Sequence, residues 1–170
     1  MNEVLKVCLQ RLLPIISYLL FPFLEINYYF ASKIYPTSDN VTLRIFYSRY
    51  LIKGLHFYEA NVYLIFILMV GVFLICSRGG FGLTRYVRFN VIQASLLDII
   101  CSCAGQIYYL LPLVIKEGNI GNVIVFFLYE GSMALIIYAI VQLIFGRYPL
   151  IPILSDAAKL QVQRGYSDDY

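Results

Sequence analysis

Polar side chains interrupt a long apolar run in the stretch Arg88-Phe-Asn-Val-Ile-Gln-Ala-Ser-Leu-Leu-Asp-Ile99, which decides the fold. A bilayer makes such groups expensive unless they face protein. At about 100° per residue, one helix face is small and polar and the other is mainly aliphatic. The small face comprises Asn90, Ala94, Asp98, Cys101 and Gly105; the aliphatic arc comprises Ile92, Leu96, Ile99, Ile100, Cys103, Ile107 and Leu110. The pattern predicts a membrane helix that packs on protein through its small face and meets lipid through its arc.

Composition points the same way. Apolar residues make up 61% of the 170 residues and charged residues 14%, with a mean hydropathy of +0.75. A soluble domain of this composition would expose a large apolar surface, so a lipid bilayer is the expected solvent. The net charge of +3 is too small and too scattered to indicate a nucleic-acid partner.

Four apolar segments of membrane-spanning length are predicted. They lie near residues 12–31, 58–76, 90–115 and 122–145. The fold class is therefore an all-α membrane protein, a four-transmembrane-helix bundle with short interfacial helices, in a single domain over residues 1–170. The first span is expected to be kinked or interrupted near Pro22, because proline lacks an amide hydrogen and disturbs the helix.

Two segments outside these spans are predicted to lie at the membrane interface. Residues 33–57 combine an aromatic face with basic residues, which favours a short interfacial helix; an irregular loop is the alternative. Pro149 and Pro152 end the fourth span, and a helix starting near Ser155 is expected to lie on the membrane. It belongs to a C-terminal tail, residues 155–170, whose polar end, Ser167-Asp-Asp-Tyr170, is expected to be disordered.

The distribution of basic residues predicts the orientation. With the spans as drawn, one side of the membrane carries eight basic residues and the other carries five. Because positive charge accumulates on the cytoplasm-like side, both termini are expected there. Three arginines in the turn before the third span, Arg78, Arg85 and Arg88, are predicted to contact anionic lipid head groups.

Polar residues inside the spans are the candidates for function. The small faces of the third and fourth spans are expected to pack together, which would place their polar residues on one seam. The seam comprises Asn90, Gln93, Asp98, Glu130 and Gln142, with Glu25 of the first span approaching the level of Glu130. Interhelical hydrogen bonding is the favoured role, a transport path is the second, and a hydrolytic carboxylate pair is the least favoured.

Catalytic and metal-binding patterns are not apparent in the sequence. His56 and Glu59 are spaced i and i+3, but further metal ligands are missing around them. The four cysteines lack a Cys-x-x-Cys pair and are interpreted as small apolar residues. No serine nucleophile motif accompanies the single histidine. We therefore expect no enzyme activity, no metal site and no cofactor.

Two blocks carry a resemblance to a known family. Together with the stretch 88–99, the block Gly146-Arg-Tyr-Pro-Leu-Ile-Pro-Ile-Leu-Ser-Asp-Ala157 and the following Gln161-Val resemble the twenty-kilodalton subunit family of the translocon at the inner chloroplast envelope. The resemblance extends in layout over residues 14–162. It implies four membrane helices, both termini in the stroma, and a part in conducting precursor proteins alongside other translocon subunits. The region before Pro36 departs most from the family, so Glu25 has no support from it.

The sequence leaves two functions open. One is a translocon subunit of the chloroplast (plastid) inner envelope membrane, or of the plasma membrane in a cyanobacterium, that contributes to the path for precursor proteins. The other is a structural or assembly subunit that conducts nothing. The expected partners are translocon subunits, precursor proteins in transit and membrane lipids, with self-association left open. The chain alone is not expected to form a pore, because four packed helices fill their own centre.

Overall fold

A computed structural model describes residues 3–79 and 82–167 of the chain. Every regular element in these residues is a helix, which confirms the predicted all-α membrane fold. Three helical stretches are long and apolar enough to cross a membrane: Gln10–Thr37, Arg85–Leu110 and Asn119–Ile144. A fourth is counted when Val62–Arg78 is taken together with the helical run Val41–Ala60 that precedes it.

The first span is a helix interrupted at a proline. It consists of α1 (Glu3–Tyr18), the π-turn η1 (Leu19–Phe23) and α2 (Leu24–Thr37). Pro22 lies inside η1, where the wider turn accommodates a residue that cannot donate a backbone hydrogen bond. The disturbance expected at Pro22 therefore takes the form of a π-turn. The helix also continues six residues beyond the predicted end at Ala31.

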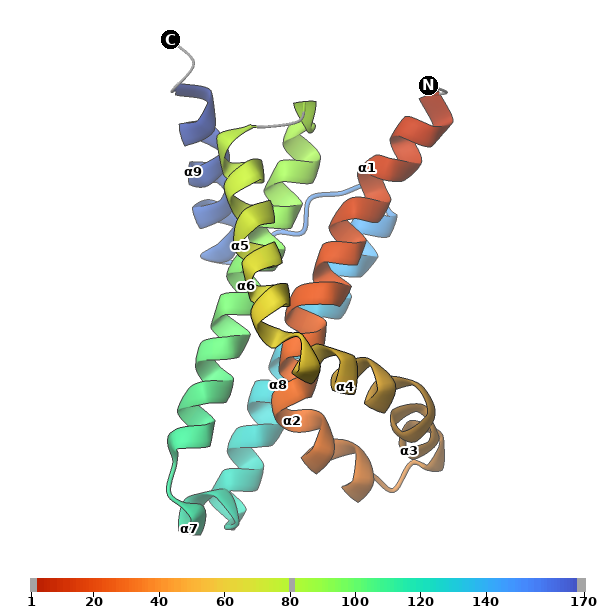
Figure 1. Ribbon diagram of the computed structural model, residues 1–170, viewed down its shortest axis with the longest axis vertical. Helices are drawn as coiled ribbons and strands as arrows, with labels where there is room; N and C mark the ends of the chain where they lie inside the picture. The colour runs from red at the N-terminus through yellow and green to blue at the C-terminus, as the bar shows by residue number, and fades with distance from the viewer. Residues whose placement is uncertain (1–2, 80–81, 168–170) are drawn as a thin grey trace.

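The second span begins at a sharp elbow. The segment before it is helical, as α3 (Val41–Phe46), η2 (Tyr47–Leu51) and α4 (Ile52–Ala60), and the Asn40 side chain caps it by accepting from the Thr42 amide at 2.9 Å. At Asn61 the chain turns by 82° into α5 (Val62–Arg78). Helix α5 has 17 residues and is about 25 Å long. It begins at Val62, four residues after the start of the predicted span 58–76. Figure 1 shows α3 and α4 as an arm beside the bundle.

Helix α6 (Arg85–Leu110) and helix α8 (Asn119–Ile144) are joined by the single-turn α7 (Leu113–Lys116). Helix α6 ends at Leu110 because Pro112 follows closely. The proline ring disfavours the helical conformation at the residue before it, Leu111. The third span therefore lies five residues earlier than the predicted 90–115. Helix α7 lies at the end of the molecule opposite to the start of α1 and the end of α9 (Figure 1).

The last helix, α9 (Leu154–Ser167), packs on the protein. It begins one residue before the predicted Ser155. Its apolar side contacts α5 and α6 and buries Ala158 and Val162, together with Ile92 of α6. The expectation that this helix simply lies on the membrane is thus incomplete, and Ile92 is removed from the predicted lipid-facing arc. Ser167 is the last residue of this helix, so the expected disorder does not begin there; residues 168–170, the rest of that end, lie outside the described residues.

The small face of α6 is buried, but against a different partner from the one predicted. Helix α6 packs mainly on α1, η1 and α2 on one side and on α5 and α9 on the other, and it contacts α8 only slightly. Gly105 lies so close to the Tyr29 ring that a Cβ atom there would clash with it. The prediction that the small faces of the third and fourth spans meet is therefore wrong. Helices α1 and α2 contact both α6 and α8 and lie between them where direct contact was predicted.

Candidate intramembrane polar site

Two carboxylates lie near the middle of their spans. Glu25 belongs to α2, and Asp98 belongs to α6, 12 residues or about 18 Å from the end of that helix at Leu110. Only 6% of Glu25 and 8% of Asp98 is exposed. The sequence predicted both residues as candidates, but it placed Glu25 near Glu130 rather than near Asp98.

Glu25 and Asp98 line the same cavity of about 450 Å³, between α2, the elbow of α4 and α5, and α6. The Tyr58 hydroxyl donates a hydrogen bond to Glu25, whereas Oδ1 of Asp98 is buried and has no hydrogen-bond partner in the described part of the chain. The remaining lining residues are polar or apolar but not basic: Tyr29, Val62, Tyr63, Ile65, Phe66, Met69, Ile99, Ser102, Cys103 and Gln106. We call this space the carboxylate cavity.

No cation of the described residues neutralises these two carboxylates. Within that part of the chain, the ion pairs are His56 with Glu59 and Lys159 with Asp156, and both are largely exposed. Sequence reasoning missed Tyr58 as a partner of Glu25, because it treated residue 58 as the start of a straight span. The break that places Tyr58 on α4 could have been suspected from the adjacent Asn61.

Glu130 occupies a second, separate space. It is exposed on α8 and lines an open groove of about 690 Å³ between α2, α3 and α8, which we call the α8 groove. Polar groups of α2, of the connection to α3 and of α8 share this groove, among them Lys33, Asp39 and Asn122. Gln142 is half-buried on α8 and lines neither the groove nor the carboxylate cavity. The structure therefore divides the predicted seam into separate places.

A buried polar cluster that the sequence analysis missed joins α2 to α8. The Tyr129 hydroxyl donates to Oδ1 of Asn27 at 3.1 Å and lies 2.7 Å from the Tyr35 hydroxyl. Close by, Lys33 Nζ donates to the Tyr108 hydroxyl of α6 at 2.6 Å. In the sequence, Asn27 could have indicated this cluster, since an asparagine inside an apolar run requires a hydrogen-bond partner in the membrane.

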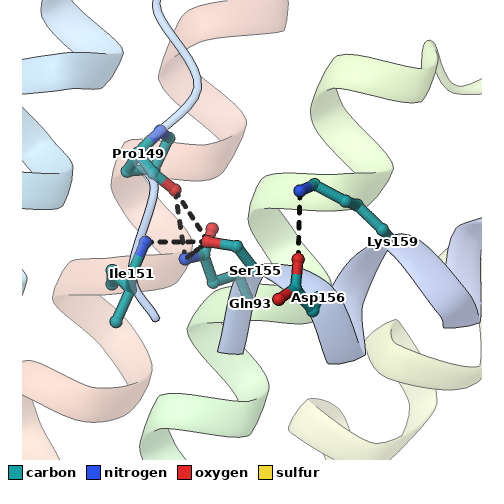
Figure 2. A network of polar contacts seen from close by, with 6 residues as sticks. All are labelled: Gln93, Pro149, Ile151, Ser155, Asp156 and Lys159. Atoms are coloured by element: carbon teal, nitrogen blue, oxygen red, sulfur yellow. Dashed lines mark hydrogen bonds and ion pairs between the residues drawn. The ribbon is translucent and has the colours of Figure 1, made fainter. Parts of the chain in front are cut away.

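The side chains of Asn90 and Gln93 form hydrogen bonds within the protein. Asn90 donates to the Tyr86 carbonyl of its own helix at 2.8 Å. Gln93 Nε2 donates to the Pro149 carbonyl and to Ser155 Oγ, each at 3.2 Å, and the Ile151 amide donates to the same Oγ at 2.7 Å (Figure 2). The network attaches the start of α9 to α6. It also brings together the two blocks that carry the family resemblance.

Removing the Ser155 hydroxyl should loosen α9. Ser155→Ala leaves the Ile151 amide and the Gln93 side chain without their shared acceptor, a loss of about 1–2 kcal/mol. We expect trypsin to cleave after Arg164 about 5–30 times faster in this variant in detergent micelles. Asp156→Ala is the matched control, because the Asp156 side chain is exposed and its one partner among the described residues is Lys159. Equal cleavage rates in the two variants would contradict this account of the network.

Arg88 does not contact lipid head groups, contrary to the prediction. It is 5% exposed, and its Nε donates to the Cys76 carbonyl at 2.6 Å, while Nη2 donates to the Ser77 carbonyl at 2.9 Å. These carbonyls belong to the last turn of α5, where intrahelical donors run out. Arg78 and Arg85 are exposed, and Arg85 lines a cavity of about 500 Å³ with Lys159 and Tyr148.

The described residues contain no group of three or more His, Cys, Asp or Glu side chains that could hold a metal ion. The three cysteines whose environment is described are free, and they lie on α5 and α6. The arrangement offers hydrogen bonding, charge pairing and lateral contact within a membrane.

These features define a multi-pass α-helical membrane protein with polar groups within its spans. Residues 8–158 match the family described as chloroplast import apparatus Tic20-like. The chain belongs to the Tic20 family, a family of protein import components of the chloroplast.

Curated relatives agree with this assignment. A Tic20 family protein of Synechocystis sp. is 34% identical over 64% of this chain and 68% of its own length. Tic20 family proteins Ycf60 of Cyanidium caldarium and Porphyra purpurea are 30% and 28% identical, over 73% and 92% of this chain. These two matches cover 60% and 77% of the relatives' own lengths.

Proposed function

We propose that this chain is a membrane subunit of the protein import translocon of the chloroplast inner envelope, and that its α8 groove forms one wall of the path for precursor proteins. Membership of the Tic20 family supports a role in protein import. The observation that carries the path is Glu130, an exposed carboxylate about 16 Å from the start of α8 at Asn119. A carboxylate facing lipid at this depth is costly, so an aqueous or protein-lined space beside it is favoured.

In the proposed arrangement, other translocon subunits close the groove around the passing precursor. Both termini face the stroma, which agrees with the excess of basic residues on that side. Helix α1 begins and α9 ends at the same end of the molecule, as this topology requires (Figure 1). Arg78 and Arg85 contact anionic head groups there. In a cyanobacterial host, the corresponding location is the plasma membrane.

The alternative is a structural or assembly subunit that conducts nothing. The closed interior of the bundle favours it, since Tyr18, Ile26 and Phe30 are fully buried. The two functions differ in what touches the α8 groove. A conducting subunit contacts a precursor there during import, whereas a structural subunit contacts only permanent neighbours.

Photocrosslinking with an arrested precursor separates these functions. A photoreactive phenylalanine analogue replaces either Phe126, which lines the groove, or Phe127, which does not; they are 57% and 70% exposed and adjacent on α8. In intact plastids, we expect position 126 to crosslink the precursor several times more strongly than position 127. Glu130→Gln should reduce that crosslink without changing the amount of protein in the membrane.

The opposite pattern would overturn the proposed path. Equal precursor labelling from both positions would show that the groove has no special role. Labelling of permanent membrane neighbours alone, with or without precursor, would favour the structural subunit.

A further inference from the structure

The carboxylate cavity contains two acidic side chains, and no basic side chain of the described residues lines it. Glu25 and Asp98 are both more than nine-tenths buried and line the cavity, and Oδ1 of Asp98, which is itself buried, has no hydrogen-bond partner among the described residues. Burying an ionised carboxylate without a partner is strongly unfavourable, and more so in a membrane. The Tyr58 hydroxyl is one neutral donor to one of the two groups. The cavity is therefore electrostatically incomplete in the isolated chain.

The rim of the cavity is apolar and open. Tyr63 and Phe66 of α5 and Ile99 of α6 border the cavity, and all three are exposed. Around them, α5 presents further exposed residues such as Leu64 and Ile67. A ligand for this site therefore needs a cationic centre for the carboxylates and an apolar surround for the rim.

We propose that the carboxylate cavity receives one lysine or arginine side chain from a transmembrane helix of a partner subunit. The aliphatic stem of such a side chain can pass the apolar rim while its charged end reaches Glu25 and Asp98. An arginine can bond each carboxylate through separate N–H groups, and a lysine can do so with its three donors. The apolar remainder of the partner helix covers Tyr63, Phe66 and Ile99.

Other occupants fit these residues less well. A divalent metal ion needs more ligands than two carboxylates and the neighbouring hydroxyls provide, and most residues that line the cavity are apolar. A passing precursor would leave both carboxylates uncompensated between import events. A resident helix compensates them continuously. The inference concerns assembly and does not depend on the proposed precursor path along α8.

Photocrosslinking in resting membranes tests the inference. A photoreactive phenylalanine analogue replaces Phe66 on the cavity rim or Ile67, the adjacent residue that does not line the cavity. With the full chain in its native membrane and no precursor present, crosslinked peptides are identified by mass spectrometry. We expect position 66 to label an apolar membrane segment that carries a lysine or arginine.

The dependence on charge is measured with a double variant. Glu25→Gln with Asp98→Asn should lower the yield from position 66 about 30-fold or more, because a buried charge pair loses its counterpart. Glu59→Gln, at an exposed carboxylate of α4 that does not line the cavity, is the matched control and should leave the yield unchanged. The neutral amides are easier to bury than carboxylates, so the double variant should retain the thermal unfolding midpoint of the parent chain in detergent.

Charge reversal provides the second measurement. Asp98→Lys should abolish the crosslink, and an acidic residue in place of the labelled partner's basic residue should restore it. A labelled segment without a basic residue, labelling of lipid alone, a yield that is insensitive to the double variant, or labelling only when a precursor is added would each overturn the inference. The last result would assign the cavity to the precursor instead. None of these outcomes decides whether the α8 groove contacts precursors.

Discussion

Arg88→Leu is expected to lower the free energy of unfolding by about 3 kcal/mol, because it removes charged hydrogen bonds to at least two buried carbonyls. The guanidinium joins three elements: Nε and Nη2 reach the Cys76 and Ser77 carbonyls of α5, and Nη2 also lies 3.5 Å from the Val162 carbonyl of α9. Leucine fills part of the volume but offers no donor. The end of α5 should therefore separate from α6 and α9.

Thermal unfolding in mild detergent measures this loss. Arg85→Leu is the control, since Arg85 is exposed on the first turn of the same helix and should change stability little. Arg88→Lys should be intermediate, because a single ammonium group cannot reproduce the planar set of donors. If Arg88→Leu and Arg85→Leu unfold at the same temperature, the guanidinium does not hold these helices together.

The assignment of Arg88 shows what the sequence could and could not reveal. Helical periodicity correctly predicted that Asn90, Ala94, Asp98, Cys101 and Gly105 share a buried face. Charge and proximity to a span end suggested lipid contact for Arg88, and that suggestion was wrong. The turn from Gly79, with its φ of 79°, returns the chain so that α6 starts beside the last carbonyls of α5. Those carbonyls need hydrogen-bond donors from outside α5. The short connection between α5 and α6 could have indicated that a residue early in α6 supplies them.

The separation of Asp98 from Glu130 has a different cause. Sequence gives the depth of a residue in a span and the face it occupies, but it does not give the order of helices around a bundle. Several arrangements bury the same small faces. Tyr29 packing against Gly105 selects α2 as the neighbour of α6, and that choice joins Asp98 to Glu25. The contact depends on the shapes of side chains 76 residues apart, which no local pattern records.

The π-turn at Pro22 was more predictable because its cause is local. A proline inside a span removes one backbone donor wherever the helix packs. The elbow at Asn61 was missed because residues 58–76 read as an uninterrupted apolar segment. The 82° turn instead directs α4 away from the direction of α5 and brings Tyr58 to Glu25.

The purified single chain should form no large-conductance channel in liposomes, whereas the assembled complex should conduct if the proposed function is correct. The interior of the bundle is closed by side chains, since Tyr18, Ile26 and Phe30 are fully buried where the first span meets α6 and α8. The carboxylate cavity and the α8 groove both open sideways, on the flanks of α2. A path wide enough for a polypeptide therefore requires a second wall from another subunit or another copy.

Planar-bilayer or liposome recordings test this expectation when the oligomeric state is measured in the same preparation. Glu130→Leu in the assembled complex should reduce conductance, since the groove would lose its carboxylate. Ile107→Leu, at an exposed position on α6, is the control and should conduct like the parent. Reproducible large channels from a demonstrated monomer would show that the bundle itself opens, because neither lateral space can enclose a polypeptide without a partner.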